Sequence, residues 1–249
     1  GLLVGAGKDQ PATTRLDEPE DLEELGEGPL ELVVSAVRQL APRVRAFELR
    51  DPQGGELPEV VPGAHLRIPL RLPSGELVDR HYSIASNPAR RDVYEIAILR
   101  EEGGSGGSAA VHDQYRIGTR LHIDIPRNHF GLHDDNRPAL LIAGGIGITP
   151  IKSMAQALKD RGADFEVHYA GRSRGEMAFR DRLERQLGNR LHIYSAADNE
   201  RLNIAQALVA APEDAVIYIC GPTRLVGAVT EAAKELGISR ERVRLELFA

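Results

Sequence analysis

The stretch Leu140 to Pro150 reads L-L-I-A-G-G-I-G-I-T-P, and the rest of the chain is organised around it. Four apolar residues run into Gly144, Gly145 and Gly147, and a helical pattern follows. Glycines let backbone N–H groups approach phosphate oxygens, and a helix N-terminus adds partial positive charge, so the stretch predicts a phosphate site. Plain turn chemistry is the alternative, since Pro150 stands where the dinucleotide fingerprint usually has its third glycine.

From Ala139 onward, the pattern alternates strands with helices. Strands are expected at 140–143, 165–170, 190–194, 215–219 and 243–247, and helices at 151–161, 176–187, 203–210 and 225–236. This alternation predicts a parallel sheet covered on both faces, in which ligands bind beyond the carboxyl ends of the strands. Two of these ends carry unusual residues, at Gly144–Pro150 and at Cys220–Pro222.

Before that point, short β-type runs are separated by proline and glycine. Strands are expected at 30–37, 46–50, 65–70, 77–84, 93–99 and 120–125. Short strands joined by tight turns are typical of a small antiparallel barrel. We therefore predict an antiparallel β-barrel domain over 29–135, followed by an α/β parallel-sheet nucleotide-binding domain over 136–249.

Residues 1–28 are acidic. They hold two bases and eight acids, which accounts for the net charge of −6, so the remainder is balanced and indicates no nucleic-acid surface. We expect a flexible leader or linker with a helical turn around Leu22 and Leu25. Because the chain starts at Gly1, we expect it to be processed or excised from a longer protein.

The composition, 42% hydrophobic and 27% charged, is that of a globular protein. No apolar run approaches the roughly 20 residues of a membrane span, and no secretory signal is visible, so we expect a cytoplasmic protein without a membrane partner. Cys220 is the single cysteine. An intrachain disulfide, or an iron–sulfur cluster held by four thiolates of this chain, is therefore excluded.

One barrel strand carries Arg80-His81-Tyr82-Ser83, with Arg80 and Tyr82 on one face and Ser83 on the other. A solvated arginine and a half-buried tyrosine on an edge strand are the alternative to a functional role. Farther along the chain lies the loop G-G-S-G-G-S at 103–108, followed by a short expected helix with Ser108 as its N-cap. This loop is either a flexible surface loop or a second phosphate cradle.

Five motifs occur in the order and spacing of the ferredoxin–NADP reductase superfamily. They are R-H-Y-S-I-A-S-N-P, the G-G-S-G-G-S loop with His112, P-R-N-H-F, A-G-G-I-G-I-T-P and I-C-G-P. Within that superfamily, residues 30–249 most resemble the phthalate dioxygenase reductase type. This type includes vanillate demethylase reductases and the reductase portions of self-sufficient cytochrome monooxygenase fusions.

The resemblance implies a role for each matching residue. The resemblance assigns catalytic roles to Ser83, Thr149, Cys220 and Glu246, where the flavin and the nicotinamide would meet. Flavin contacts fall to Arg80, His81, Tyr82, Ser83, Ala97, Ile98, Leu99, Gly106, Gly107, Ser108 and Phe248. Nicotinamide-nucleotide contacts fall to Gly144, Gly145, Gly147, Thr149, Pro150, Cys220, Gly221 and Pro222. The protein then contributes positioning and electrostatics, while the flavin carries the chemistry.

The resemblance also implies a reaction. The chain would take hydride from NADPH or NADH and pass single electrons to a 2Fe–2S ferredoxin domain or protein that serves an oxygenase. The resemblance to the phthalate dioxygenase type and the G-G-S-G-G-S loop favour FMN over FAD, and no segment of the barrel half clearly suits an adenine. Relatives usually carry the 2Fe–2S domain after the segment matching 245–248, whereas this sequence stops at Ala249. A free flavin or ferric-chelate reductase and a non-catalytic nucleotide-sensing module remain alternatives.

The donor preference follows from the tip of the second α/β strand. An acidic residue there favours the ribose hydroxyl of NADH, whereas arginine accommodates the 2′-phosphate of NADPH. The tip reads Gly171-Arg172-Ser173-Arg174, with no carboxylate before Glu176. The sequence therefore favours NADPH through Arg172, Ser173 and Arg174, although a solvated basic strand end gives the same pattern and many relatives of this type use NADH.

Four polar residues carry no functional assignment, and the chemical form of Cys220 has two interpretations. His129, His133, Asp134 and Asp135 have a spacing that could suit a metal, but we expect a solvated connection there and assign no metal ligand. Cys220 could be a catalytic thiolate, yet its place between a buried strand and Gly-Pro fits a small neutral lining residue better.

Overall fold

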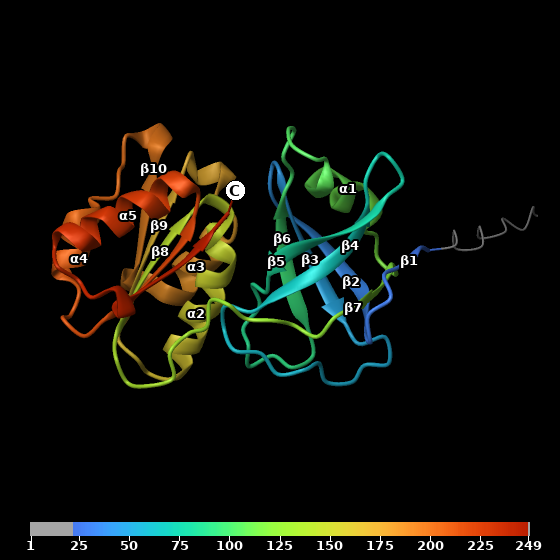
Figure 1. The fold of residues 1–249 in the computed structure, drawn as a ribbon, viewed down its shortest axis with the longest axis horizontal. Helices are drawn as coiled ribbons and strands as arrows, with labels where there is room; N and C mark the ends of the chain where they lie inside the picture. The colour runs from blue at the N-terminus through green and yellow to red at the C-terminus, as the bar shows by residue number, and fades with distance from the viewer. Residues whose placement is uncertain (1–21, 249) are drawn as a thin grey trace, which may run out of the picture.

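The structure is a computed structural model that describes residues 22–248. It has two lobes side by side, with the carboxyl end of the chain between them (Figure 1). The strands of the first lobe are β1 (Glu24–Leu25), β2 (Leu30–Ala41), β3 (Val44–Arg50), β4 (His65–Arg71), β5 (Leu77–Ser83), β6 (Tyr94–Leu99) and β7 (Arg120–Ile123), and its helix is α1 (Gly107–Gln114).

The first lobe is the predicted barrel-like domain. One sheet has the order β1-β7-β2-β3-β6, and β4 pairs with β5 as a second, antiparallel sheet. Alternating apolar residues of both sheets, such as Leu32, Phe47, Leu66 and Ile96, are fully buried in one core. Helix α1 closes one end of this lobe (Figure 1). The six predicted strands are all present, with ends shifted by a few residues.

The acidic segment gave one wrong prediction. Residues 1–21 lie outside the described part of the chain, but around Leu22 and Leu25 there is no helical turn. Glu24 and Leu25 form strand β1 instead, pairing in parallel with Arg120 and Leu121 of β7. Leu25 is buried in the barrel core, and burial of that side chain outweighs the local acidic composition.

The second lobe is the predicted α/β domain. Its strands are β8 (Ala139–Gly144), β9 (Phe165–Gly171), β10 (Leu191–Ser195), β11 (Val216–Gly221) and β12 (Val243–Leu247). Its helices are α2 (Ile148–Asp160), α3 (Arg180–Leu187), α4 (Ile204–Ala210) and α5 (Thr223–Glu235). Short 3-10 turns lie at Gly145–Gly147, Arg174–Glu176, Gly188–Arg190, Ala196–Asp198 and Arg240–Arg242. The predicted helix at 176–187 is shorter than expected, because the chain turns at Phe179, which has a φ of +63°.

The order of this sheet is β10-β9-β8-β11-β12, and every pair in it is parallel. The first and fourth strands of the domain, β8 and β11, are thus neighbours, and the order reverses between them. A crevice opens at such a switch point beyond the carboxyl ends of the strands. The glycine turn after β8 and Cys220–Pro222 at the carboxyl end of β11 both lie there. Helices α2 and α3 cover the face toward the barrel, and α4 and α5 cover the opposite face (Figure 1).

A buried charged cluster joins the lobes. Lys152 of α2 donates a hydrogen bond to the carbonyl oxygen of Ala85 (2.8 Å) and lies 3.9 Å from the carboxylate of Glu95 on β6. Arg182 of α3 reaches the same carboxylate at 3.2 Å. Burial lowers the pKa of Lys152 to about 8, although Glu95 opposes the shift. One carboxylate of the barrel therefore compensates two cations of the nucleotide domain.

We predict that Glu95→Ala destabilises the protein by about 3–5 kcal/mol, because it leaves buried Lys152 without its counter-charge. The midpoint of urea unfolding measures this change. The matched control is Glu31→Ala, which removes an exposed ion pair with Arg120 (2.7 Å) and should cost at most about 1 kcal/mol. Equal effects of the two substitutions would contradict the role given to Glu95.

Candidate functional site

The nucleotide edge is built by close backbone packing between β8 and β11. A Cβ atom at Gly147 would collide with the carbonyl oxygen of Cys220, so only glycine lets the turn approach β11. Gly145 has a φ of +54° and faces open space. Pro150 is the third residue of α2, where no N–H donor is required. Thr149 donates to the carbonyl oxygen of Ile146 (3.2 Å) and stabilises this turn.

A pocket of about 280 Å³ opens beyond this turn. Its walls come from both lobes, with Arg43 and Leu99 on the barrel side and Arg172 and Met177 on the α/β side. The predicted nucleotide residues in its lining are Gly144, Gly145, Arg172 and Pro222. Gly147, Pro150, Cys220 and Gly221 do not line it, and all four are buried.

The barrel lobe holds a second pocket, of about 340 Å³. Predicted residues that line it are Arg80, His81, Tyr82, Ser83, Ala97, Leu99, Gly106, Gly107, Ser108, Thr149 and Phe248. Burial raises the pKa of Tyr82 to about 12, so the phenol stays neutral. Ile98 does not line the pocket, since its side chain lies in the barrel core and its carbonyl oxygen bonds the ring of His112 (2.7 Å).

One end of the second pocket suits a phosphate. The Arg80 guanidinium donates to Ser105 Oγ (3.0 Å) and to the carbonyl oxygen of Asp79 (3.0 Å), which holds it beside the start of α1. The first bond inside α1 runs from the Ala110 N–H to the Gly106 carbonyl oxygen, so earlier N–H groups are not used within the helix. A cation and a helix N-terminus therefore converge where the resemblance places the flavin phosphate.

The predicted capping role of Ser108 is wrong. Gly106, with a φ of +82°, is the N-cap of α1, and Ser108 is the second helical residue. Its hydroxyl instead accepts a hydrogen bond from the Glu101 N–H (2.9 Å), which ties the helix to the preceding strand end. The serine that meets Arg80 is Ser105, which was not selected from sequence, although the motif contains both serines.

The two pockets share a wall. Leu99, Glu101, Ile146 and Phe248 line both of them. Glu101 was not selected from sequence, because nothing in its local pattern marks a residue that two domains use. Ile146 lies within the predicted nucleotide turn at 144–149, but a contact with the flavin pocket was not expected of it. The Phe248 N–H donates to the carbonyl oxygen of Gly221 (2.9 Å), so the last described residue is held against the end of β11.

A cross-domain hydrogen bond lies behind this wall. Ser83 Oγ donates to Glu246 Oε1 (3.2 Å), and Glu246 is the register partner of Cys220 on β11. Burial raises the pKa of Glu246, and the bond from Ser83 partly offsets that shift. Burial, with Glu246 nearby, also raises the pKa of Cys220 far above its ordinary value. Cys220 is thus a neutral thiol rather than a thiolate, but it does not itself line either pocket.

Arg174 is not free to meet a nucleotide phosphate. Its guanidinium forms ion pairs with Asp198 (2.7 Å) and Glu200, which follow β10. Ser173 hydrogen-bonds Glu176 (3.2 Å), and neither Ser173 nor Arg174 lines the nucleotide pocket. The sequence showed no carboxylate before Glu176, but the parallel pairing of β9 with β10 brings two of them to this tip.

The connection between the domains also differs from its prediction. His133 is buried rather than solvated, and its Nδ1 and Nε2 bond the Tyr218 hydroxyl (2.8 Å) and the Arg137 carbonyl oxygen (2.7 Å). With both ring nitrogens in use, His133 is a structural residue. A larger open hollow lies beside it and contains none of the predicted site residues.

Two protein families match the chain, one in each domain. "Oxidoreductase FAD-binding domain" matches residues 31–131, and "Dimethylamine monooxygenase subunit DmmA-like, N-terminal domain" matches residues 125–243. In the described part of the chain, no helix is long and apolar enough to cross a membrane.

Similar proteins span the same two domains. Vanillate O-demethylase oxidoreductase of a Pseudomonas species is 40% identical, over 88% of this chain and 69% of its own length. The structure of phthalate dioxygenase reductase, a modular protein for electron transfer from pyridine nucleotides to a 2Fe–2S centre, aligns with a TM-score of 0.80 at 30% identity, over 88% of this chain and 68% of its own. An intact type IV self-sufficient cytochrome P450 monooxygenase aligns with a TM-score of 0.79 at 34% identity, and this chain spans 28% of it.

The fold and its paired pockets define a two-domain flavoprotein oxidoreductase that uses a pyridine nucleotide. The chain belongs to the phthalate dioxygenase reductase type of the ferredoxin–NADP reductase superfamily. Its relatives include reductase components of oxygenase systems, such as the carnitine monooxygenase reductase subunit of Escherichia coli, 34% identical over 88% of this chain and 68% of its own length.

We predict that Arg80→Ala weakens flavin retention by about 1.5–3 kcal/mol, the cost of one lost charged hydrogen bond to phosphate. The ratio of flavin to protein absorbance after gel filtration measures it. Arg120→Ala is the control, because Arg120 pairs with Glu31 on the barrel surface, away from the pocket. A parent-like flavin content in the Arg80 variant would remove Arg80 from the cradle.

Proposed function

We propose that this chain takes hydride from a reduced nicotinamide nucleotide and releases electrons one at a time to a 2Fe–2S partner that serves an oxygenase. The observation that supports this most directly is the shared wall of Leu99, Glu101, Ile146 and Phe248 between the two pockets. Hydride transfer needs reacting atoms about 3–3.5 Å apart, which requires two adjacent sites with a thin partition.

The residues at and beside this shared wall position the reactants. When bound, the flavin supplies the step from two-electron to one-electron transfer. Ser83 presents a hydroxyl at the flavin pocket, and Glu246 holds that hydroxyl in place (3.2 Å). Cys220 and Gly221 keep the strand end small, so that the nicotinamide ring can lie close to the wall. Thr149 lines the flavin pocket from α2.

The flavin in this proposal is FMN. Arg80, Ser105 and the start of α1 line the pocket's phosphate end, and this set of groups suits a terminal phosphate. An adenosine would have to extend past Gly103 and Gly104, which carry no side chains to hold it. Chromatography of the flavin released by heat distinguishes FMN from FAD.

The one-electron acceptor in this proposal comes from outside the 249 residues. A plant-type cluster needs four cysteine thiolates, whereas the sequence contains only Cys220. Phthalate dioxygenase reductase transfers electrons to a 2Fe–2S centre, and we extend that acceptor, and an oxygenase beyond it, to this chain. We also propose that the protein works in the cytoplasm, where its single cysteine stays reduced.

The donor in this proposal is NADPH, bound through Arg172 alone. Arg172 lines the nucleotide pocket, and its side chain makes no hydrogen bond or ion pair within the described residues. Arg174 is already neutralised by Asp198 and Glu200. A single available guanidinium can still bind a 2′-phosphate through charge-assisted hydrogen bonds.

We predict that Ser83→Ala and Cys220→Ala each slow flavin reduction at least about tenfold at saturating donor, a barrier increase of about 1.4 kcal/mol. Both change alignment at the partition without touching the phosphate cradle, so flavin content should stay normal. Anaerobic stopped-flow absorbance measures the rate. The control is Ser35→Ala, which removes a hydroxyl bonded to Glu48 on the barrel sheet. Parent-like rates in both test variants would overturn the proposed hydride site.

We predict that Arg172→Ala lowers kcat/KM for NADPH by about tenfold or more, as expected for one lost charged hydrogen bond of about 1.5–3 kcal/mol. The value for NADH should change little, since NADH lacks the 2′-phosphate. Arg174→Ala is the comparison and should affect both donors alike. A parent that prefers NADH, or an Arg172 variant that loses both donors equally, would contradict the NADPH proposal.

A further inference from the structure

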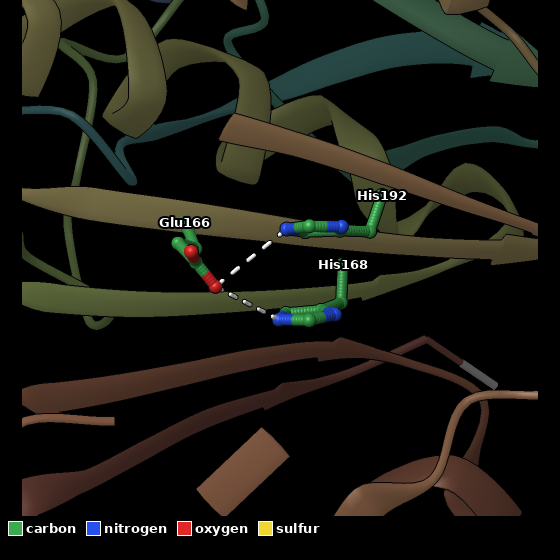
Figure 2. A group of neighbouring side chains, drawn as sticks. All are labelled: Glu166, His168 and His192. Carbon is green, nitrogen blue, oxygen red and sulfur yellow. Dashed lines mark ion pairs between the residues drawn. The ribbon is translucent and has the colours of Figure 1, made fainter. Parts of the chain in front are cut away.

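Two histidines and a glutamate converge on the outer face of the α/β sheet, away from both pockets (Figure 2). Glu166 and His168 lie two residues apart on β9 and therefore share one face. His192 of the edge strand β10 is the direct register partner of His168. The proposed reductase function uses none of these three residues.

The side chains turn their polar ends toward one point. Glu166 Oε2 lies 3.7 Å from His168 Nε2 and 3.6 Å from His192 Nε2, and the three candidate ligand atoms are within 4.8 Å of one another. The imidazole rings are stacked, with centroids 4.7 Å apart. Figure 2 shows the Nε2 end of each ring facing the carboxylate. Donor atoms bonded to one Zn²⁺ at about 2.0–2.2 Å stand roughly 3.3–3.6 Å apart in a tetrahedron, so small side-chain adjustments would close the site.

Neither Nε2 atom makes a hydrogen bond to Glu166. Distances of 3.6–3.7 Å to Glu166 are too long for hydrogen bonds. Among the described residues, His192 Nε2 is buried and has no hydrogen-bond partner. A buried polar atom without a partner is costly, and a metal ion would satisfy it.

A neighbouring hydroxyl supports the orientation of His168. His168 Nδ1 lies 2.8 Å from the Tyr194 hydroxyl. When the ring donates its Nδ1 proton to that oxygen, the Nε2 lone pair is left facing Glu166. Metal-binding histidines usually have such a partner on the other ring nitrogen, which sets the tautomer and the ring angle.

We propose that Glu166, His168 and His192 form a binding site for one divalent transition-metal ion, Zn²⁺ fitting best, that ties edge strand β10 to β9. Two imidazoles and a carboxylate are ligands that Zn²⁺ accepts, whereas Mg²⁺ and Ca²⁺ prefer oxygen. The side chains of His168, His192 and Glu166 are 9%, 39% and 58% exposed, so an ion can enter from solvent and keep water as a further ligand.

The test is isothermal titration of tag-free holoprotein, stripped with EDTA, with ZnCl₂ and, separately, MgCl₂. We expect one equivalent of Zn²⁺ to bind with a micromolar or tighter Kd and no heat from Mg²⁺. His192→Ala and Glu166→Gln should each weaken Zn²⁺ binding by more than tenfold. Tyr194→Phe should weaken it by about tenfold through loss of ring orientation.

His122→Ala is the matched control. His122 also lies near two glutamates, Glu24 and Glu31, but Glu31 already forms an ion pair with Arg120 (2.7 Å). This variant should bind Zn²⁺ as the parent does. Co²⁺ absorption gives a second readout, since bound Co²⁺ should develop visible bands in the parent and not in His192→Ala. No Zn²⁺ binding at tens of micromolar, or binding unchanged in both His192→Ala and Glu166→Gln, overturns the proposal. Circular dichroism confirms that each variant is folded.

Discussion

The site depends on one cross-domain contact, the hydrogen bond from Ser83 on β5 to Glu246 on β12 (3.2 Å). Glu246 lies opposite Cys220 in the register of β11 and β12, so this bond connects the barrel to the switch point of the parallel sheet. Phe248 lies two residues after Glu246 and lines both pockets. Glu246 is half-buried, and a partly desolvated carboxyl group is costly to leave unpaired, so this hydrogen bond favours contact between the strand end and the barrel.

The rest of the domain interface also depends on the pairing of desolvated charged groups. Lys152 and Arg182 from α2 and α3 both meet Glu95 of the barrel. Both cations also lie over the ring of Phe179, at 4.9 and 5.1 Å from its centroid. Buried charges must be compensated, and they can be compensated in few geometries, so the cluster restricts how the lobes pack. A fixed orientation is what two adjacent pockets with a common wall require.

Several features followed from the sequence because they rest on local physics. Repeating apolar and turn residues predicted the strands, the barrel-then-α/β order and the phosphate turn, since each depends on neighbours a few residues away. Gly147 is an example, because only glycine permits backbone contact with β11. Arg80 and the 103–108 loop were also found, although the choice between Ser105 and Ser108 depended on which serine the helix would contain.

Tertiary structure alone decided what lies across from each local element. Leu25 is part of a strand because its side chain is buried in the barrel core, although the surrounding sequence is acidic. Arg174 lost its predicted role because the parallel register of β9 and β10 placed Asp198 and Glu200 beside it. The same register set His192 against His168. These pairings join segments more than twenty residues apart, and no local pattern contains them, because strand order and register are set by how the whole sheet buries its faces.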